Sequence, residues 1–233
     1  LSIAAMPALT KSFFANDKTL VAKQINQAFQ VILVLIIPAV VGLSLLSHEA
    51  YGALYGMENL EITGNLLAWY APVALFFALF TVSSAVLQGI NEQRYAVYSL
   101  AAGLLLKVLL NIQLIHMFGA KGAIYGTALA AVTSVVLNLW RIKAAIDFSY
   151  KKIFKRTMLV GIFVVIMSAA VLILKLVFGL FIPYEETRWG AIIMLTIGVL
   201  GGAFIYLWFA YHSTLLERVL GSRIKVLDRI FGR

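Results

Sequence analysis

One lysine in the middle of an apolar segment is the residue in this sequence whose type and position point most directly to chemistry. Lys107 lies near the centre of the run from Tyr95 to Phe118, which is long enough to cross a bilayer, because a spanning helix takes about 20 apolar residues. At about 1.5 Å of rise per residue, its ammonium group lies further from both membrane surfaces than a lysine side chain can reach. Lys107 must therefore face protein, water or a ligand.

A small residue and an amide share the helical face of this lysine. Residues four apart lie one above the other on a helix, so Gly103, Lys107 and Asn111 form one stripe. A cation at the centre of a bilayer costs from about 2.5 kcal/mol to well over about 10 kcal/mol, which makes it a candidate functional residue. We expect Lys107, supported by Asn111, to bind an anion or a substrate. The alternative is a structural lysine that donates hydrogen bonds to carbonyls or hydroxyls of neighbouring helices.

The preceding apolar segment carries a second polar stripe, formed by Thr81, Ser84 and Gln88 at helical spacing. These three residues are further candidates for lining a substrate cavity. For each hydroxyl taken alone, a hydrogen bond back to a carbonyl of its own helix is the favoured alternative. Gln88 lies near the end of its segment, so its role is left open.

Residues for catalysis or metal binding do not gather anywhere in the sequence. There is no cysteine, and His48, His116 and His212 stand apart from one another, so no metal site is expected. We find no nucleophile with a neighbouring base and no constellation of paired carboxylates arranged for acid–base catalysis. The sequence predicts a protein that is not an enzyme and that uses no cofactor.

The elements that hold these residues are membrane spans. Of the 233 residues, 62% are hydrophobic and 12% are charged, a balance that soluble domains do not have. We predict an all-α integral membrane protein, a polytopic helical bundle. Residues 1–212 form its transmembrane bundle, with six spans at about 28–47, 65–87, 96–118, 122–142, 157–181 and 189–210.

Charge sets the expected orientation of these spans. Most of the 19 lysines and arginines fall in loops on one side, which the positive-inside rule assigns to the cytoplasm. No acidic residue falls within a span, so we expect no carboxylate in this chain that carries a coupling ion. Residues 213–233 read as a basic amphipathic tail on the cytoplasmic membrane surface, with a frayed terminus as the alternative. The opening residues, about 1–9, resemble the end of a seventh span, which suggests the C-terminal part of a longer protein.

Three stretches also resemble a known family. They are MPALTKSFF (6–14), LQGINEQRYAVYSLAAGLLLKVLLN (87–111) and FGAKGAIYGTALA (118–130). The chain is similar throughout to the C-terminal half of transporters of the multidrug/oligosaccharidyl-lipid/polysaccharide superfamily. Within it, the likeness is to the MurJ-type lipid II flippases and the stage V sporulation protein B group.

The resemblance implies a fourteen-helix transporter, of which this chain supplies the last six helices and the end of the eighth. Such proteins move undecaprenyl-pyrophosphate-linked saccharides across the bacterial cytoplasmic membrane by alternating access, for peptidoglycan or polysaccharide synthesis. By the same likeness, the spans at 157–181 and 189–210 form a hydrophobic groove for the lipid tail. Lys107 and Asn111 match a recurrent pattern of the family. The implied partners are a lipid-linked oligosaccharide, membrane lipids and the N-terminal half of the transporter, with no nucleic acid.

Two other functions stay open from the sequence. An ion-coupled drug or metabolite antiporter of the same superfamily would need a carboxylate within the membrane, which would have to lie in the remainder of the protein. A membrane glycosyltransferase or polymerase acting on the same lipid-linked sugars usually carries a large outer loop with catalytic residues, and the outer loops here are short. We therefore predict a flippase as the leading function.

Overall fold

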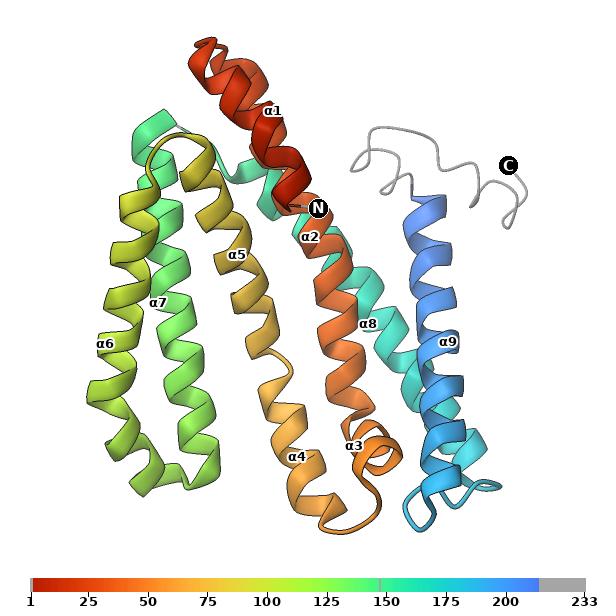
Figure 1. The fold of residues 1–233 in the computed structure, drawn as a ribbon. Coiled ribbons are helices and arrows are strands. Elements are labelled where there is room, and N and C mark those ends of the chain that lie inside the picture. The colour runs from red at the N-terminus through yellow and green to blue at the C-terminus, as the bar shows by residue number, and fades with distance from the viewer. Residues whose placement is uncertain (1, 147, 214–233) are drawn as a thin grey trace. The chain divides into compact units, whose positions relative to one another are not determined.

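The computed structural model describes residues 2–146 and 148–213, with side chains from Pro7 onward. Within these ranges all regular structure is helical, as Figure 1 shows. The helices are α1 (Ser2–Phe14), α2 (Lys18–Leu45), α3 (Ser47–Tyr55), α4 (Leu60–Tyr70), α5 (Val73–Gly89), α6 (Gln93–Phe118), α7 (Ala120–Ile146), α8 (Lys151–Gly179) and α9 (Arg188–His212). The predicted amphipathic tail falls almost entirely outside the described residues.

Six segments are long and apolar enough to cross a membrane, which confirms the predicted fold class. They are α2, the pair of α4 and α5, and the helices α6, α7, α8 and α9. The first of them begins ten residues before the predicted span, at Lys18 rather than at residue 28. Its start is fixed by Asp17, whose Oδ1 accepts hydrogen bonds from the Leu20 amide at 3.0 Å and from the Thr19 hydroxyl at 2.7 Å.

Two prolines shape the membrane helices, and each leaves a carbonyl that a neighbouring helix satisfies. A proline has no N–H, so the carbonyl four residues before it loses its helical donor. Pro72 ends α4 at Tyr70, and the freed carbonyl of Ala68 accepts from Ser44 Oγ at 3.1 Å. The sequence analysis did not predict the donor, which comes from α2 and not from the same helix.

The described chain divides into two compact units. Unit 1 holds the chain up to Leu33 together with Val73–Arg156, and unit 2 holds Val34–Pro72 together with the chain from Thr157 onward. Helices α2 and α8 therefore contribute to both units.

In unit 1, α6 and α7 form an antiparallel hairpin (Figure 1). The hairpin turns at Gly119, whose φ of +61° lies in the left-handed region that glycine adopts without strain. Helix α1 packs on α5, where Leu9 occupies the space beside Gly89: a Cβ there would lie 2.6 Å from Leu9 Cδ2. The candidate site residues of the sequence analysis all lie in this unit.

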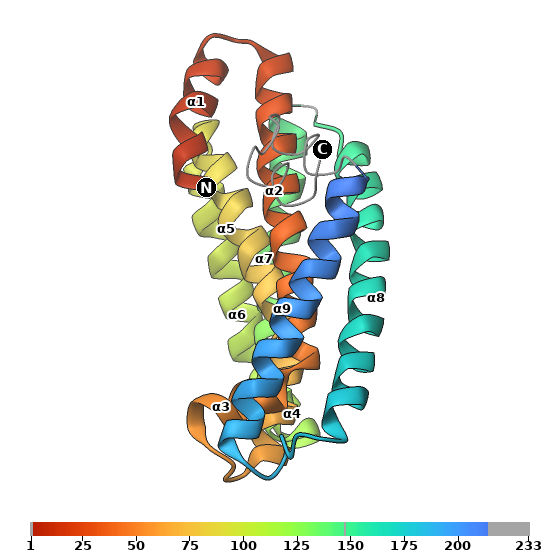
Figure 2. The ribbon, with the colours of Figure 1, turned by 90° about the vertical axis from the view of Figure 1, so that its right-hand side faces the viewer.

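In unit 2, α8 and α9 form a second helical hairpin (Figure 2), and α3 packs against α4 and the start of α9. The contact of α3 with α9 is close, because a Cβ at Gly52 would lie 3.2 Å from Ala191 Cβ. The connection between the first two predicted spans is thus not a plain loop, since it contains this nine-residue helix.

Candidate substrate site

The predicted stripe of Gly103, Lys107 and Asn111 faces α7. A Cβ at Gly103 would lie 2.3 Å from Ser134 Oγ and 2.5 Å from the carbonyl oxygen of Ala130, so the two helices meet there without room for a larger residue. Near the other end of the stripe, Asn111 Oδ1 lies 2.9 Å from the Cβ position of Gly126. The shared face exists as expected, and it forms the contact between α6 and α7.

Lys107 is half-buried and has no partner in unit 1. Its ammonium group makes no hydrogen bond and no ion pair with any residue that the structure describes. Asn111 Oδ1, one turn further on, is also buried without a hydrogen-bond donor among these residues. A cation and an amide oxygen both need polar partners in an apolar medium. Water, substrate or another part of the protein must supply them.

The three candidates on α5 lie in different surroundings. Thr81 is exposed and its hydroxyl donates to the Phe77 carbonyl of its own helix at 2.9 Å, which is the alternative that the sequence favoured. Gln88 is exposed near the end of α5. Ser84 is buried, and its hydroxyl accepts a hydrogen bond from Asn138 on α7 at 3.1 Å. None of the three hydrogen-bonds to Lys107 or Asn111 within the described structure.

Asn138 is the centre of a buried polar network that joins α5, α6 and α7. It is fully buried, its amide nitrogen donates to Ser83 Oγ at 3.0 Å and to Ser84 Oγ, and its Oδ1 accepts from Ser99 Oγ at 2.5 Å. Ser134 Oγ donates to the Ser99 carbonyl at 3.0 Å. Ser134 and Asn138 lie four residues apart on one face of α7, but nothing in the sequence indicates this pairing. The network fixes the three helices around the stripe that carries Lys107.

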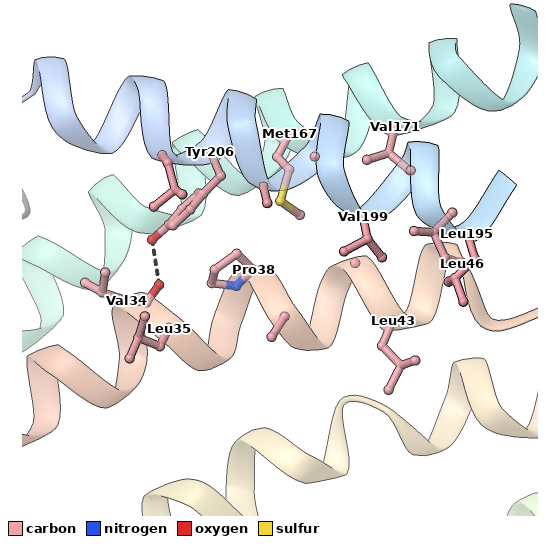
Figure 3. Close-up of a pocket in the computed structure, with 16 residues that line it drawn as sticks. Val34, Leu35, Pro38, Leu43, Leu46, Met167, Val171, Leu195, Val199 and Tyr206 are labelled. Carbon is pink, nitrogen blue, oxygen red and sulfur yellow. Dashed lines mark hydrogen bonds between the residues drawn. The ribbon is translucent and has the colours of Figure 1, made fainter. Parts of the chain in front are cut away.

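Unit 2 contains an apolar groove of about 410 Å³ between the second half of α2 and the helices α8 and α9. Figure 3 shows its walls: Pro38 and Leu43 from α2, Met167 and Val171 from α8, and Val199 from α9. The resemblance predicted a groove formed by the last two spans, and the structure adds α2 as a third wall.

One hydrogen bond crosses this groove. Tyr206 of α9 donates its hydroxyl to the Val34 carbonyl of α2 at 2.7 Å (Figure 3). That carbonyl lies four residues before Pro38 and so lacks a helical N–H donor. The tyrosine hydroxyl is therefore the group that satisfies the carbonyl, and it ties α9 to the bend of α2.

A buried ion pair lies beyond the end of the groove, and sequence reasoning missed it. Glu49 of α3 is fully buried and its Oε1 lies 2.7 Å from Lys175 Nζ of α8, which also donates to the Leu45 carbonyl at 3.2 Å. Glu49 was expected in a loop outside the spans, whereas it is the one buried acidic residue in the described part of the chain. Lys175 follows Met167 and Val171 at four-residue spacing on α8, so it lies on the same stripe as two residues of the groove wall.

The aromatic ring of Tyr184 completes this end of unit 2. It lies in the connection between α8 and α9, with its centroid 5.7 Å from Lys175 Nζ. The pKa of Tyr184 is raised by partial burial and, to a smaller degree, by the nearby Glu185 and Glu49 carboxylates. Its hydroxyl therefore stays protonated at neutral pH.

Comparison with known proteins agrees with these features. A family model described as lipid II flippase MurJ matches residues 1–200. The chain belongs to the MurJ lipid II flippase family. It is 44% identical to the lipid II flippase MurJ of Bacillus subtilis over 94% of this chain and 41% of that protein. It is also 26% identical, over 59% of this chain and 29% of the relative, to a Haloferax volcanii protein named "Probable low-salt glycan biosynthesis flippase Agl15".

A solved structure shares the fold. It is titled "Lipid II flippase MurJ, inward closed conformation", with a TM-score of 0.73 and 20% identity over 95% of this chain and 43% of that one. The chain thus spans less than half the length of the relatives that it matches. The predicted family and the predicted fold, part of a larger helical transporter, are both confirmed.

Proposed function

We propose that the protein containing this chain is a flippase that moves undecaprenyl-pyrophosphate-linked saccharides, such as lipid II, across the bacterial cytoplasmic membrane by alternating access. The observation that carries this proposal is the family match over residues 1–200. Its C-terminus lies on the cytoplasmic side in our proposal, because the lysines and arginines concentrate in the loops of that side. The N-terminal half of the transporter completes the cavity.

Two features of the chain match the two parts of such a substrate. The apolar groove of unit 2 suits the polyprenyl tail, and the polar stripe with Lys107 suits the charged headgroup. The groove of unit 2 has the lining that a polyprenyl chain needs, since its walls are aliphatic and its one hydroxyl is already bonded to Val34. Lys107, which lacks a partner in unit 1, offers a cation to a pyrophosphate or a sugar oxygen. In this proposal Asn111 assists with its side-chain amide, and Gln88, Thr81 and Ser84 stay candidates for the cavity wall.

The antiporter alternative would need a carboxylate free to bind and release a cation. The buried carboxylate of Glu49 does not meet this requirement, because Lys175 already holds it in an ion pair at 2.7 Å. The ion pair of Glu49 therefore gives no support to a coupling site in this chain.

Complementation tests the proposal. The full-length gene is expressed in a strain depleted of its own lipid II flippases, with membrane levels of the protein checked by blotting. We expect growth to be restored. If wild-type protein reaches the membrane at normal levels and growth still fails, lipid II is not the substrate, and binding of other polyprenyl-linked sugars to the purified protein becomes the next comparison.

A further inference from the structure

A polar cavity of about 490 Å³ lies in unit 1 where α5 ends, α6 begins and α7 ends. The residues that matter in it are Glu92, Arg94, Tyr95, Tyr98 and Arg141, which we call the headgroup shelf. It is separate from the stripe of Lys107, which begins about two turns further along α6. The proposed transport mechanism makes no use of it.

The charges of the shelf leave one cation unpaired. Arg141 Nη2 lies 2.5 Å from Glu92 Oε1, and its guanidinium carbon lies 4.0 Å from the centre of the Tyr95 ring. Arg141 is therefore held and neutralised by its own neighbours. Arg94 is exposed and makes no hydrogen bond or ion pair with the described residues. The shelf thus presents one free guanidinium beside a fixed, neutral pair.

An apolar stripe leads from the shelf along α6. Tyr98, Leu105, Leu109 and Ile112 follow at the spacing of one helical face, and their exposed fractions are 63%, 64%, 70% and 68%. Tyrosines with an apolar ring and a polar hydroxyl are typical of the level of lipid headgroups in a membrane protein. The face therefore changes from cationic to aromatic to aliphatic in the order in which a phospholipid changes from headgroup to chain.

We propose that the headgroup shelf binds the phosphate of an anionic glycerophospholipid, with one acyl chain lying along the stripe of α6. The Arg94 guanidinium pairs with the phosphate, and the Tyr95 and Tyr98 hydroxyls donate to its oxygens or to the headgroup. One unpaired guanidinium matches the single charge of a phosphodiester, whereas a diphosphate carries more charge than this shelf can balance. The site holds a lipid of the bilayer and not the transported molecule.

Lipid titration of the purified full-length protein tests this inference. Native mass spectrometry measures the binding of phosphatidylglycerol to the wild type, to Arg94→Gln and to Lys143→Gln. Lys143 is a matched control because it is an exposed cation near the end of α7 that does not line the shelf. We expect Arg94→Gln to weaken phosphatidylglycerol binding about fivefold, because the phosphate loses one direct hydrogen-bonded contact, and Lys143→Gln to leave it unchanged, because Lys143 does not line the shelf. Equal binding by all three proteins would overturn the proposal.

One further variant and two further ligands test whether the shelf binds a phospholipid, free phosphate or the transported lipid. We expect Arg94→Lys to keep most of the binding, which excludes misfolding as the cause of the loss. Inorganic phosphate at the same concentration should not displace the lipid, because it lacks an acyl chain. If Arg94→Gln weakens the binding of undecaprenyl diphosphate but not of phosphatidylglycerol, the shelf is a substrate site and the lipid assignment is wrong.

Discussion

The hydrogen bond between Tyr206 and Val34 gives the sharpest stability prediction of the structure. Tyr206→Phe removes the hydroxyl that satisfies the Val34 carbonyl, and Pro38 prevents the helix from supplying an N–H in its place. Tyr206 is 4% exposed and the surrounding groove is apolar, so water does not replace the lost donor easily. An unsatisfied buried carbonyl costs about 1–3 kcal/mol, and we expect a loss of this size.

A second substitution makes the reasoning specific. Pro38→Ala restores an N–H four residues after Val34, so the carbonyl regains a donor within α2. Tyr206→Phe should then cost less than about 1 kcal/mol in the Pro38→Ala background, which corresponds to a coupling free energy of about 1–2 kcal/mol between the two positions. The coupling free energy is the cost of Tyr206→Phe with Pro38 present minus its cost in the Pro38→Ala background. Any separate effect of Pro38→Ala on stability, such as straightening α2, cancels in this subtraction.

Denaturant titration of the purified full-length protein in detergent measures these free energies of unfolding. Tyr70→Phe serves as the control, because Tyr70 is exposed and makes no hydrogen bond in the described structure through its side chain. We expect this control to change the free energy of unfolding by less than about 0.5 kcal/mol. If Tyr206→Phe costs the same with and without Pro38, the hydroxyl does not act by replacing the donor that proline removes.

Three further predictions concern other contacts. Lys175→Ala leaves the buried Glu49 carboxylate without its partner and should lower the free energy of unfolding by about 3–5 kcal/mol, whereas the double variant Lys175→Met with Glu49→Gln should recover most of this in the same titration. Gly103→Val places a Cβ 2.3 Å from the facing hydroxyl of α7 and should cost about 1–3 kcal/mol or more, measured against Gly103→Ala, which brings in the same first atom with less bulk. The protection of the Leu20 amide against hydrogen exchange, relative to the intrinsic rate at each pH, should fall as the pH drops through the lowered pKa of Asp17, because the carboxylate caps this amide only when ionised; Asp17→Ala should lack this protection at every pH.

The sign of the Asp17 prediction follows from its pKa. Hydrogen bonds from the Leu20 amide and the Thr19 hydroxyl lower the pKa of this carboxyl below its ordinary value of 3.8. Its contribution is therefore complete above that value and is lost as the pH falls through the lowered pKa. Protection of the Leu20 amide that does not fall at low pH, or that survives in Asp17→Ala, would contradict the capping role.

Apolar length was enough to predict the membrane helices from the sequence. The stripe of Gly103, Lys107 and Asn111 was expected because helical spacing is local. The pairing of Glu49 with Lys175 was missed because 126 residues separate them in the chain, and no local pattern joins them. The network at Asn138 was missed for the same reason, since its partners come from two other helices.

Exposure explains the remaining difference between the expected and the observed candidate site. Thr81, Ser84 and Gln88 share a spacing but not a surrounding, because the contact with α7 buries Ser84 and leaves the other two residues on an exposed surface. Spacing predicts which residues share a face, whereas neighbouring helices decide what that face meets.

The most direct test of the central claim measures lipid II on the outer surface of cells whose only flippase is the full-length protein. Wild type, Lys107→Ala, Lys107→Arg and the exposed control Lys143→Ala are compared at equal membrane levels, and the fraction of lipid II open to an externally added modifying enzyme is determined. The account predicts a loss of at least about tenfold for Lys107→Ala, consistent with a charge-assisted contact of about 1.5–3 kcal/mol, with partial activity for Lys107→Arg and full activity for Lys143→Ala. Full activity of Lys107→Ala would show that the lysine does not hold the substrate.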